Sequence, residues 1–311
     1  MSSSRVSLQK QKRKFEGFKL FLMISPFLVL VFIFCWFPLY GWIYAFFDFQ
    51  PPTKLAQSEF VGVYWFKLLI SNSIRIRQTL EVLRNTFVMS GLGILTSWVP
   101  ILFAILLSQC QRSWLKRSVQ TITTLPNFIS WVLVYSFAFA LFSNNGAANS
   151  ILMKLNVIDQ PILFLQQSNH VWLNMLLWGM WKSLGWSSIL YLAALSGIDS
   201  QLYDAAKVDG AGRFRIIWHV DLPGLIPTYF VLLLLSVASF LNNGMDQYYV
   251  FQNAFNKSQI QVLDLYVYNI GIVSGSYSLA TAISMLKSVV SVTLLFSSNK
   301  LSKVIRGESI I

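Results

Sequence analysis

The sequence predicts an all-α membrane protein with six transmembrane helices in a single domain. Hydrophobic residues make up 55% of its 311 residues, and charged residues make up only 12%, whereas soluble domains contain about 25% charged residues. Six apolar stretches are long enough to cross the hydrocarbon core of a bilayer, which takes about 20 residues of helix. Neither a low-complexity linker nor an obvious internal repeat divides the chain.

Polar segments separate the six expected spans, and the only charged residues inside the spans are Lys182 and Lys287. A basic N-terminus, residues 1–18, precedes a first span that is too long for a signal peptide and has no small-residue cleavage site after it. Ile76, Leu80 and Leu83 recur at helical spacing before the second span, which favours a short interfacial helix there, with a solvated loop as the alternative. Within the single domain 19–311 the spans are expected at 20–47, 85–111, 118–142, 171–198, 223–245 and 277–299.

The distribution of basic residues predicts the orientation of the chain. If both termini are cytoplasmic, the inner segments contain 15 Lys and Arg and the outer segments contain 7. Cytoplasmic loops of membrane proteins carry an excess of these residues, so both termini are expected inside the cell. The net charge of +12 is explained in the same way, and nucleic acid is not an expected partner.

The loop at 199–222 has the sharpest local pattern in the chain. Asp204 is expected to open a short Ala-rich helix, where its charge suits the positive end of the helix dipole. Gly210 permits a sharp turn, Phe214 begins the apolar face of a second short helix, and Pro223 suits the first turn of the fifth span. A helical hairpin that merely connects two spans is the alternative.

This pattern resembles the cytoplasmic "EAA" loop in permease subunits of ABC importers: Glu-Ala-Ala, three residues, Gly, nine residues, then Ile-x-Leu-Pro. Asp204 replaces the Glu and Val220 replaces the Ile, but every spacing holds through Pro223. The resemblance implies a type I ABC importer fold like that of maltose permeases, with this loop seated in a cleft of a separate ATPase subunit. The residues to which it gives this coupling role are Asp204, Ala205, Ala206, Asp209, Gly210, Ala211, Phe214, Leu222 and Pro223.

The resemblance covers nearly all of the chain after the basic N-terminus. The stretches 181–186, 191–199 and 266–271 are similar to oligosaccharide-importing permeases, in particular to those that serve uronate-containing or branched glycan fragments. It implies a bacterial cell-membrane protein that pairs with a second homologous permease, an ABC ATPase dimer and an extracellular solute-binding protein or lipoprotein. ATP and Mg²⁺ would bind to the ATPase, because this chain has no Gly-Lys pair and therefore no phosphate-binding loop.

Candidate residues of a sugar path lie on three segments. Lys182 shares a helix face with Trp178 and Trp186, and an aromatic face beside a hydrogen-bonding group suits the apolar faces and polar rim of a sugar. An embedded charge is itself a functional candidate. Packing and interfacial roles are the alternatives for these residues. The other candidates are Ser284 and Lys287 on the sixth span, and Asn243 and Asp246 at the outer end of the fifth.

Two other classes of protein compete with a permease. A membrane enzyme acting on lipid-linked sugars would normally show paired acidic residues, but the 12 Asp and Glu are scattered along the chain. A secondary transporter or channel often shows repeat symmetry and buried carboxylates in its spans, which are not expected here. His170, His219, Cys35 and Cys110 are isolated, so neither a catalytic site nor a metal site is predicted.

Overall fold

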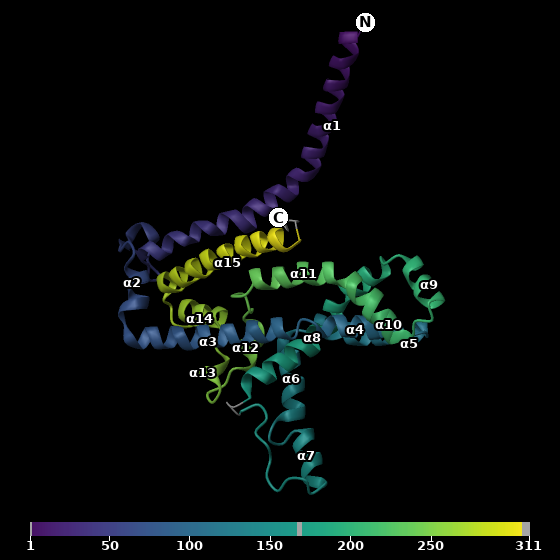
Figure 1. Ribbon diagram of the computed structural model, residues 1–311. Coiled ribbons are helices and arrows are strands. Elements are labelled where there is room, and N and C mark those ends of the chain that lie inside the picture. Colours follow the sequence, from purple (N-terminus) through teal and green to yellow (C-terminus); the bar gives the residue numbers. More distant parts are fainter. Residues whose placement is uncertain (1, 167–169, 307–311) are drawn as a thin grey trace.

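The structure is a computed structural model that describes residues 2–166 and 170–306, and these form an almost entirely helical fold. Four helical segments are long and apolar enough to cross a membrane: Gly17–Phe46, Ser73–Ser108, Arg213–Ala238 and Tyr277–Lys303. Several of these segments run roughly parallel to one another, as is expected of helices that cross the same membrane (Figure 1). The prediction of an all-α membrane protein is confirmed.

The first span is a nearly continuous helical segment that curves along its length (Figure 1). It consists of α1 (Ser2–Val31), a π-helical turn (Phe32–Trp36) and a 3₁₀ segment (Phe37–Phe46), and α1 extends away from the other helices (Figure 1). Its large apolar side chains from residue 18 to residue 40 are mostly exposed, as is typical of a surface that faces lipid or another chain. The 3₁₀ part packs on the last helix.

A small hairpin follows the first span. Strand β1 (Phe47–Asp48) pairs antiparallel with β2 (Glu59–Phe60), with Phe47 opposite Phe60 and a short 3₁₀ turn (Leu55–Gln57) between them. Helix α2 (Tyr64–Ser71) then leads to the second span.

The second span begins earlier than predicted. Helix α3 (Ser73–Leu95) starts where the Asn72 side chain accepts bonds from the backbone N–H groups of Ile74 and Arg75, and α4 (Val99–Ser108) continues it. Residues 76–84, expected as a separate interfacial helix, are therefore the first turns of α3. No helix breaker lies between them and the apolar part, and the exposed pair Arg77–Glu81 at 3.3 Å suits a continuous helix.

The third span, expected over 118–142, is not one straight helix. Helix α5 (Ser113–Thr124) and a 3₁₀ turn (Leu125–Phe128) are followed by α6 (Trp131–Phe142), and the helical axis bends by 106° between them. Pro126 has no N–H to continue the helix, and Ser130 starts the new helix by accepting a bond from the N–H of Leu133. Helix α6 and the following α7 (Ala147–Lys154) project away from the long helices (Figure 1).

The fourth expected span is the single helix α8 (Val171–Ser196). Its 26 residues extend about 39 Å, which is enough to cross a membrane. Its tryptophans, Asn174 and Lys182 lower its mean hydropathy below that of the four segments above. Counting α8 and the bent pair as spans gives the predicted total of six, whereas length and hydropathy alone give four or five.

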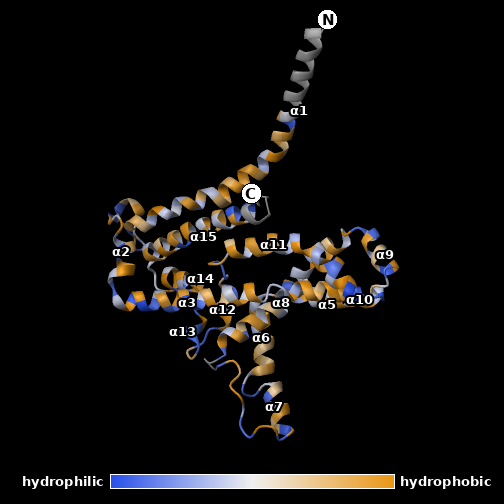
Figure 2. Ribbon diagram, in the orientation of Figure 1, coloured by the Kyte–Doolittle hydropathy of each residue, from blue (hydrophilic) through white to orange (hydrophobic). Residues whose placement is uncertain are grey.

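The fifth span is shifted toward the N-terminus relative to the prediction. A short helix α9 (Ser200–Val208) precedes α10 (Arg213–Ile216), a π-turn (Ile217–Asp221) and α11 (Leu222–Ala238), which run on without a break. The span therefore starts at Arg213 rather than at 223, and regular helix ends at Ala238 rather than at 245. Figure 2 shows that polar residues concentrate at α9 and α10, whereas α11 is largely apolar.

Short helices connect the last two spans. They are α12 (Asp246–Phe251), α13 (Lys257–Ile260), α14 (Leu263–Tyr268) and a π-turn (Asn269–Val273). The final helix, α15 (Tyr277–Arg306), begins where the sequence predicts and continues beyond 299.

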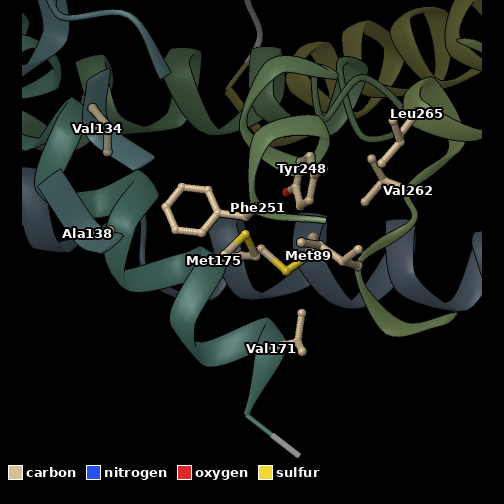
Figure 3. Close-up of a cluster of buried hydrophobic side chains, with 10 residues drawn as sticks. Met89, Val134, Ala138, Val171, Met175, Tyr248, Phe251, Val262 and Leu265 are labelled. Carbon is tan, nitrogen blue, oxygen red and sulfur yellow. The ribbon is translucent and has the colours of Figure 1, made fainter. Parts of the chain in front are cut away.

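Three clusters of buried side chains hold these elements together. In the largest, Met89 and Met175 lie beside Phe251 (Figure 3), so that α3, α8 and α12 share one core with α6. A second cluster joins α14 and α15 to α2 and α3. The third joins α4, α8 and α11 through Ile105, Tyr191 and Leu225.

Candidate functional site

The loop from α9 to α10 differs in one respect from the expected geometry. Asp199, not Asp204, starts α9, because the Asp199 carboxylate accepts a 2.9 Å bond from the N–H of Gln201. Asp204 lies within α9, exposed, and pairs with Lys207 at 3.2 Å. The sequence contained the signal for this cap, since an Asp before a helical stretch is a preferred N-cap.

The turn at Gly210 has the conformation that its residue type suggests. Gly210 has a φ of +68°, a left-handed backbone that side chains resist. The N–H of Ala211 bonds to the carbonyl of Ala206 at 2.8 Å and that of Gly210 to Lys207 at 3.0 Å, which is the Schellman pattern that closes a helix. No atom lies within 4 Å of an added Cβ at Gly210, so only the backbone conformation restricts this position inside the chain.

Large apolar side chains are uncovered on this loop. Val208 and Phe214 are each 88% exposed and Trp218 is 70% exposed. Asp204, Ala205 and Asp209 are exposed beside them, while Ala206, Ala211 and Leu222 are half-buried and Pro223 is exposed. We call the side chains of Val208, Phe214 and Trp218 the loop patch. An apolar patch of this kind next to charged residues is typical of a protein-binding surface.

A buried carboxylate lies behind the loop patch. Asp221 is 1% exposed, and its two oxygens accept bonds from the Tyr203 hydroxyl at 2.7 Å and the Gln109 amide at 3.1 Å. Burial and the bond to Asp221 raise the pKa of Tyr203 well above its usual range, so the hydroxyl remains a donor at physiological pH. Sequence reasoning missed this triad because its members are far apart in the chain.

A cavity of about 910 Å³ lies among the long helices. Its walls come mainly from α3, α4, α8, α11 and α12, and Trp131 of α6 adds one aromatic side chain. None of its described lining residues is charged. The lining residues able to hydrogen-bond or to offer an aromatic face are Thr96, Ser97, Trp131, Ser183, Trp186, Ser187, Tyr191, Ser236, Ser239, Gln247 and Tyr248.

The three candidates on α8 do not line one path. Trp186 lines the cavity, but Trp178 lines a separate apolar pocket of about 460 Å³ with Trp181. Lys182 is 9% exposed, and its ammonium donates to the backbone carbonyls of Asn127 at 2.8 Å and Pro126 at 3.1 Å. Lys182 therefore binds the bend between α5 and α6 rather than lining the cavity.

Lys182 also contacts one residue of the cavity wall, Trp131. Its ammonium lies 5.4 Å from the ring centre of Trp131, over the ring face, which is a cation–π distance. One turn further along α8, Gly185 lies so close to the chain at Thr123 that a Cβ would be 2.3 Å from its carbonyl oxygen. These contacts fix α8 against the bent pair.

The candidates near the ends of the last two spans are also separated. Lys287 forms an ion pair with Asp264 of α14, whose other oxygen accepts a 3.0 Å bond from the N–H of Gly244. Ser284 lines a small pocket of about 350 Å³ beside this pair. Asn243 donates to Ser90 on α3 at 2.9 Å, and Asp246 is exposed at the start of α12. Sequence reasoning overlooked Asp264 because it lies between two spans.

Among the described residues, no group of three or more His, Cys, Asp and Glu side chains is placed to hold a metal ion.

Comparisons with known proteins were made for the sequence and for the fold. The family described as "Binding-protein-dependent transport system inner membrane component" matches residues 96–299. The chain is 38% identical to Protein LplB of Bacillus subtilis over 91% of this chain and 88% of LplB. It is 36% identical to the polygalacturonan/rhamnogalacturonan transport system permease protein YteP of the same organism, over 98% of this chain and 96% of YteP.

A solved structure shares nearly the whole fold. It is described as a bacterial ABC transporter involved in the import of the acidic polysaccharide alginate, and one of its chains is 28% identical with a TM-score of 0.83, over 96% of this chain and 99% of that chain. A second structure of the alginate transporter, in complex with a pentasaccharide-bound periplasmic protein, matches equally well. The chain therefore belongs to the family of inner-membrane components of binding-protein-dependent transport systems, as a sugar ABC importer permease and not an enzyme.

Proposed function

We propose that this permease moves an oligosaccharide into the cell and that its α9–α10 loop docks on a separate ATPase, which binds ATP and Mg²⁺. The observation that supports the docking most directly is the loop patch. Val208 and Phe214 are almost fully exposed, on either side of the Gly210 turn. Leaving them in water is unfavourable, whereas a partner cleft would bury them. The coupling role of Asp204, Ala205, Ala206, Asp209 and Ala211 is part of this proposal.

The cavity supports a sugar as cargo. Its hydroxyl groups can exchange hydrogen bonds with sugar hydroxyls, and Trp131 and Trp186 can pack against the apolar faces of sugar rings. The similar proteins YteP and the alginate transporter have names that refer to acidic polysaccharides. We therefore propose a complex or uronate-containing glycan fragment.

We propose an assembly that the family and the structure of the alginate transporter support. It contains a second homologous permease, an ATPase dimer and an extracellular solute-binding protein, in the lipid of a bacterial cell membrane. Both termini would be cytoplasmic, which the excess of Lys and Arg on that side supports. This orientation also puts the loop patch in the cytoplasm, where the ATPase would be.

The experiment is uptake of a labelled oligosaccharide by the complete transporter reconstituted in liposomes. We expect uptake to require ATP on the side of the loop patch. Gly210→Val should abolish it, because a β-branched residue resists the positive φ. Gly212→Val is the matched control, since Gly212 has an ordinary extended backbone with a φ of −71° and open space around an added Cβ.

Two results would contradict the proposal. If the Gly210→Val complex still shows normal uptake and ATP hydrolysis stimulated by the binding protein, the loop is not the coupling element. If uptake follows an ion gradient without ATP, the chain functions as a secondary transporter. The embedded pair of Asp264 and Lys287 is the observation that favours that second candidate.

A further inference from the structure

The triad of Tyr203, Asp221 and Gln109 joins three parts of the chain at one carboxylate. Tyr203 belongs to α9, Asp221 ends the π-turn that leads into α11, and Gln109 is the residue at the C-terminal end of α4. Each oxygen of Asp221 accepts one bond, at 2.7 Å from Tyr203 and at 3.1 Å from Gln109. The carboxylate therefore bridges two elements that are 94 residues apart in sequence, from 109 to 203.

This bridge is strong for a contact between loop and span. A buried carboxylate loses its hydration, so the bonds that replace it, of which the one from Tyr203 is short at 2.7 Å, cannot be given up at little cost. The Tyr203 hydroxyl keeps its proton at physiological pH, as tyrosine ordinarily does, and burial raises its pKa further. A displacement of α9 therefore pulls on Asp221 rather than breaking away from it.

The two helices held by Asp221 both reach the cavity. Helix α4 begins at Val99, which lines the cavity with Pro100, and Leu232 and Ser236 of α11 line it from another side. Helix α4 is only 10 residues long, about 15 Å, and its backbone hydrogen bonds resist bending over so short a length. A shift at its Gln109 end must therefore appear at its cavity end.

We infer that Asp221 is a positioning residue that transmits movement of α9 to the cavity walls on α4 and α11. This inference rests on the proposed function, because it presumes that the ATPase moves α9. It adds a residue to the coupling path that the Glu-Ala-Ala pattern does not contain, since Asp221 occupies the unspecified position before Leu222 and Pro223.

A merely structural role would change stability and not coupling. The decisive readout is therefore the number of cargo molecules imported per ATP hydrolysed, measured on the complete reconstituted transporter, with melting temperature and subunit co-purification recorded for the same samples. Co-purification of the subunits identifies any complex that does not assemble. The ratio of cargo to ATP is therefore taken only from intact complexes.

Tyr203→Phe removes one donor with almost no change of shape. Gln109→Glu puts a second carboxylate against Asp221 and repels it. We expect either variant to lower cargo per ATP by about tenfold, the effect of losing one hydrogen bond to a charged group. Tyr249→Phe is the control, since this exposed tyrosine on α12 lies outside the triad and the cavity lining.

A double variant tests the bridge itself. In Gln109→Glu/Asp221→Asn the charge moves to position 109, the new amide donates to it, and the amide oxygen still accepts from Tyr203. We expect this double variant to recover most of the ratio lost in Gln109→Glu. A wild-type ratio in both Tyr203→Phe and Gln109→Glu would overturn the inference, and so would a double variant as defective as the single one. If the wild-type complex itself shows no ATP-dependent uptake, the proposed function fails instead.

Discussion

Lys182→Met removes the ammonium that binds the bend between α5 and α6 while it keeps most of the side-chain stem. The carbonyl of Pro126 retains a second bond, from the N–H of Ile129 at 3.2 Å. The carbonyl of Asn127 loses the 2.8 Å bond from Lys182. An unsatisfied, partly buried carbonyl costs about 2 kcal/mol, so that the bend should open locally about thirtyfold more often, at 1.36 kcal/mol for each factor of ten.

Hydrogen exchange on the complex in lipid nanodiscs measures this opening. We expect faster exchange of a peptide that spans 125–133 in Lys182→Met and unchanged exchange in α15, which packs mainly on the 3₁₀ segment of the first span and on α11. Because Trp131 contacts the same ammonium and lines the cavity, the affinity for cargo should weaken as well. Unchanged exchange at 125–133 would refute the assignment of Lys182 to the bend. Normal exchange together with impaired uptake would indicate that Lys182 acts in the sugar path instead.

Two further predictions concern packing within the membrane. Gly185→Ala should destabilise the complex by about 1–3 kcal/mol, because the new Cβ would overlap the backbone at Thr123. Gly91→Ala on α3 is the control and should be neutral, because there is open space around its added Cβ. Thermal melting in detergent compares the two variants. Lys287→Met should lower the melting temperature more than the double variant Lys287→Met/Asp264→Asn, because the single change leaves a carboxylate without its cation. Equal melting temperatures of the single and the double variant would mean that a carboxylate without its cation is not costly at this position.

The loop at 199–222 was the most predictable part of the chain, because its pattern depends on local backbone requirements. A positive φ at Gly210 and a proline at the start of α11 can be recognised from residue types alone. The cap at Asp199 was misassigned to Asp204 for a related reason. Both acids precede helix-forming residues, and only the observed bond from Gln201 to Asp199 decides between them.

The bend after Pro126 was not predictable from hydropathy. Membrane helices often contain proline without breaking, because neighbouring groups bond to the freed carbonyls. Here the helix ends instead, and the carbonyls of Pro126 and Asn127 bond to Lys182. Lys182 lies 55 residues from Asn127, so no local pattern identifies it as the partner. Asp264 and Asp221 were missed for the same reason, since the importance of each comes from contacts with distant residues.

Three charged side chains that this fold holds inside or beside the spans have partners within the chain. Lys182 binds backbone carbonyls, Lys287 binds Asp264, and Asp221 binds Tyr203 and Gln109. Each embedded charge requires a partner because lipid supplies none, and these partners turn the charges away from the cavity. The described residues that line the cavity are neutral, so the cavity can bind sugar hydroxyls and ring faces but offers no cation to a carboxylate. If the cargo is a uronate, we expect its carboxylates to face the proposed second permease, so that affinity for them is changed by substitutions in that partner rather than in the cavity lining of this chain.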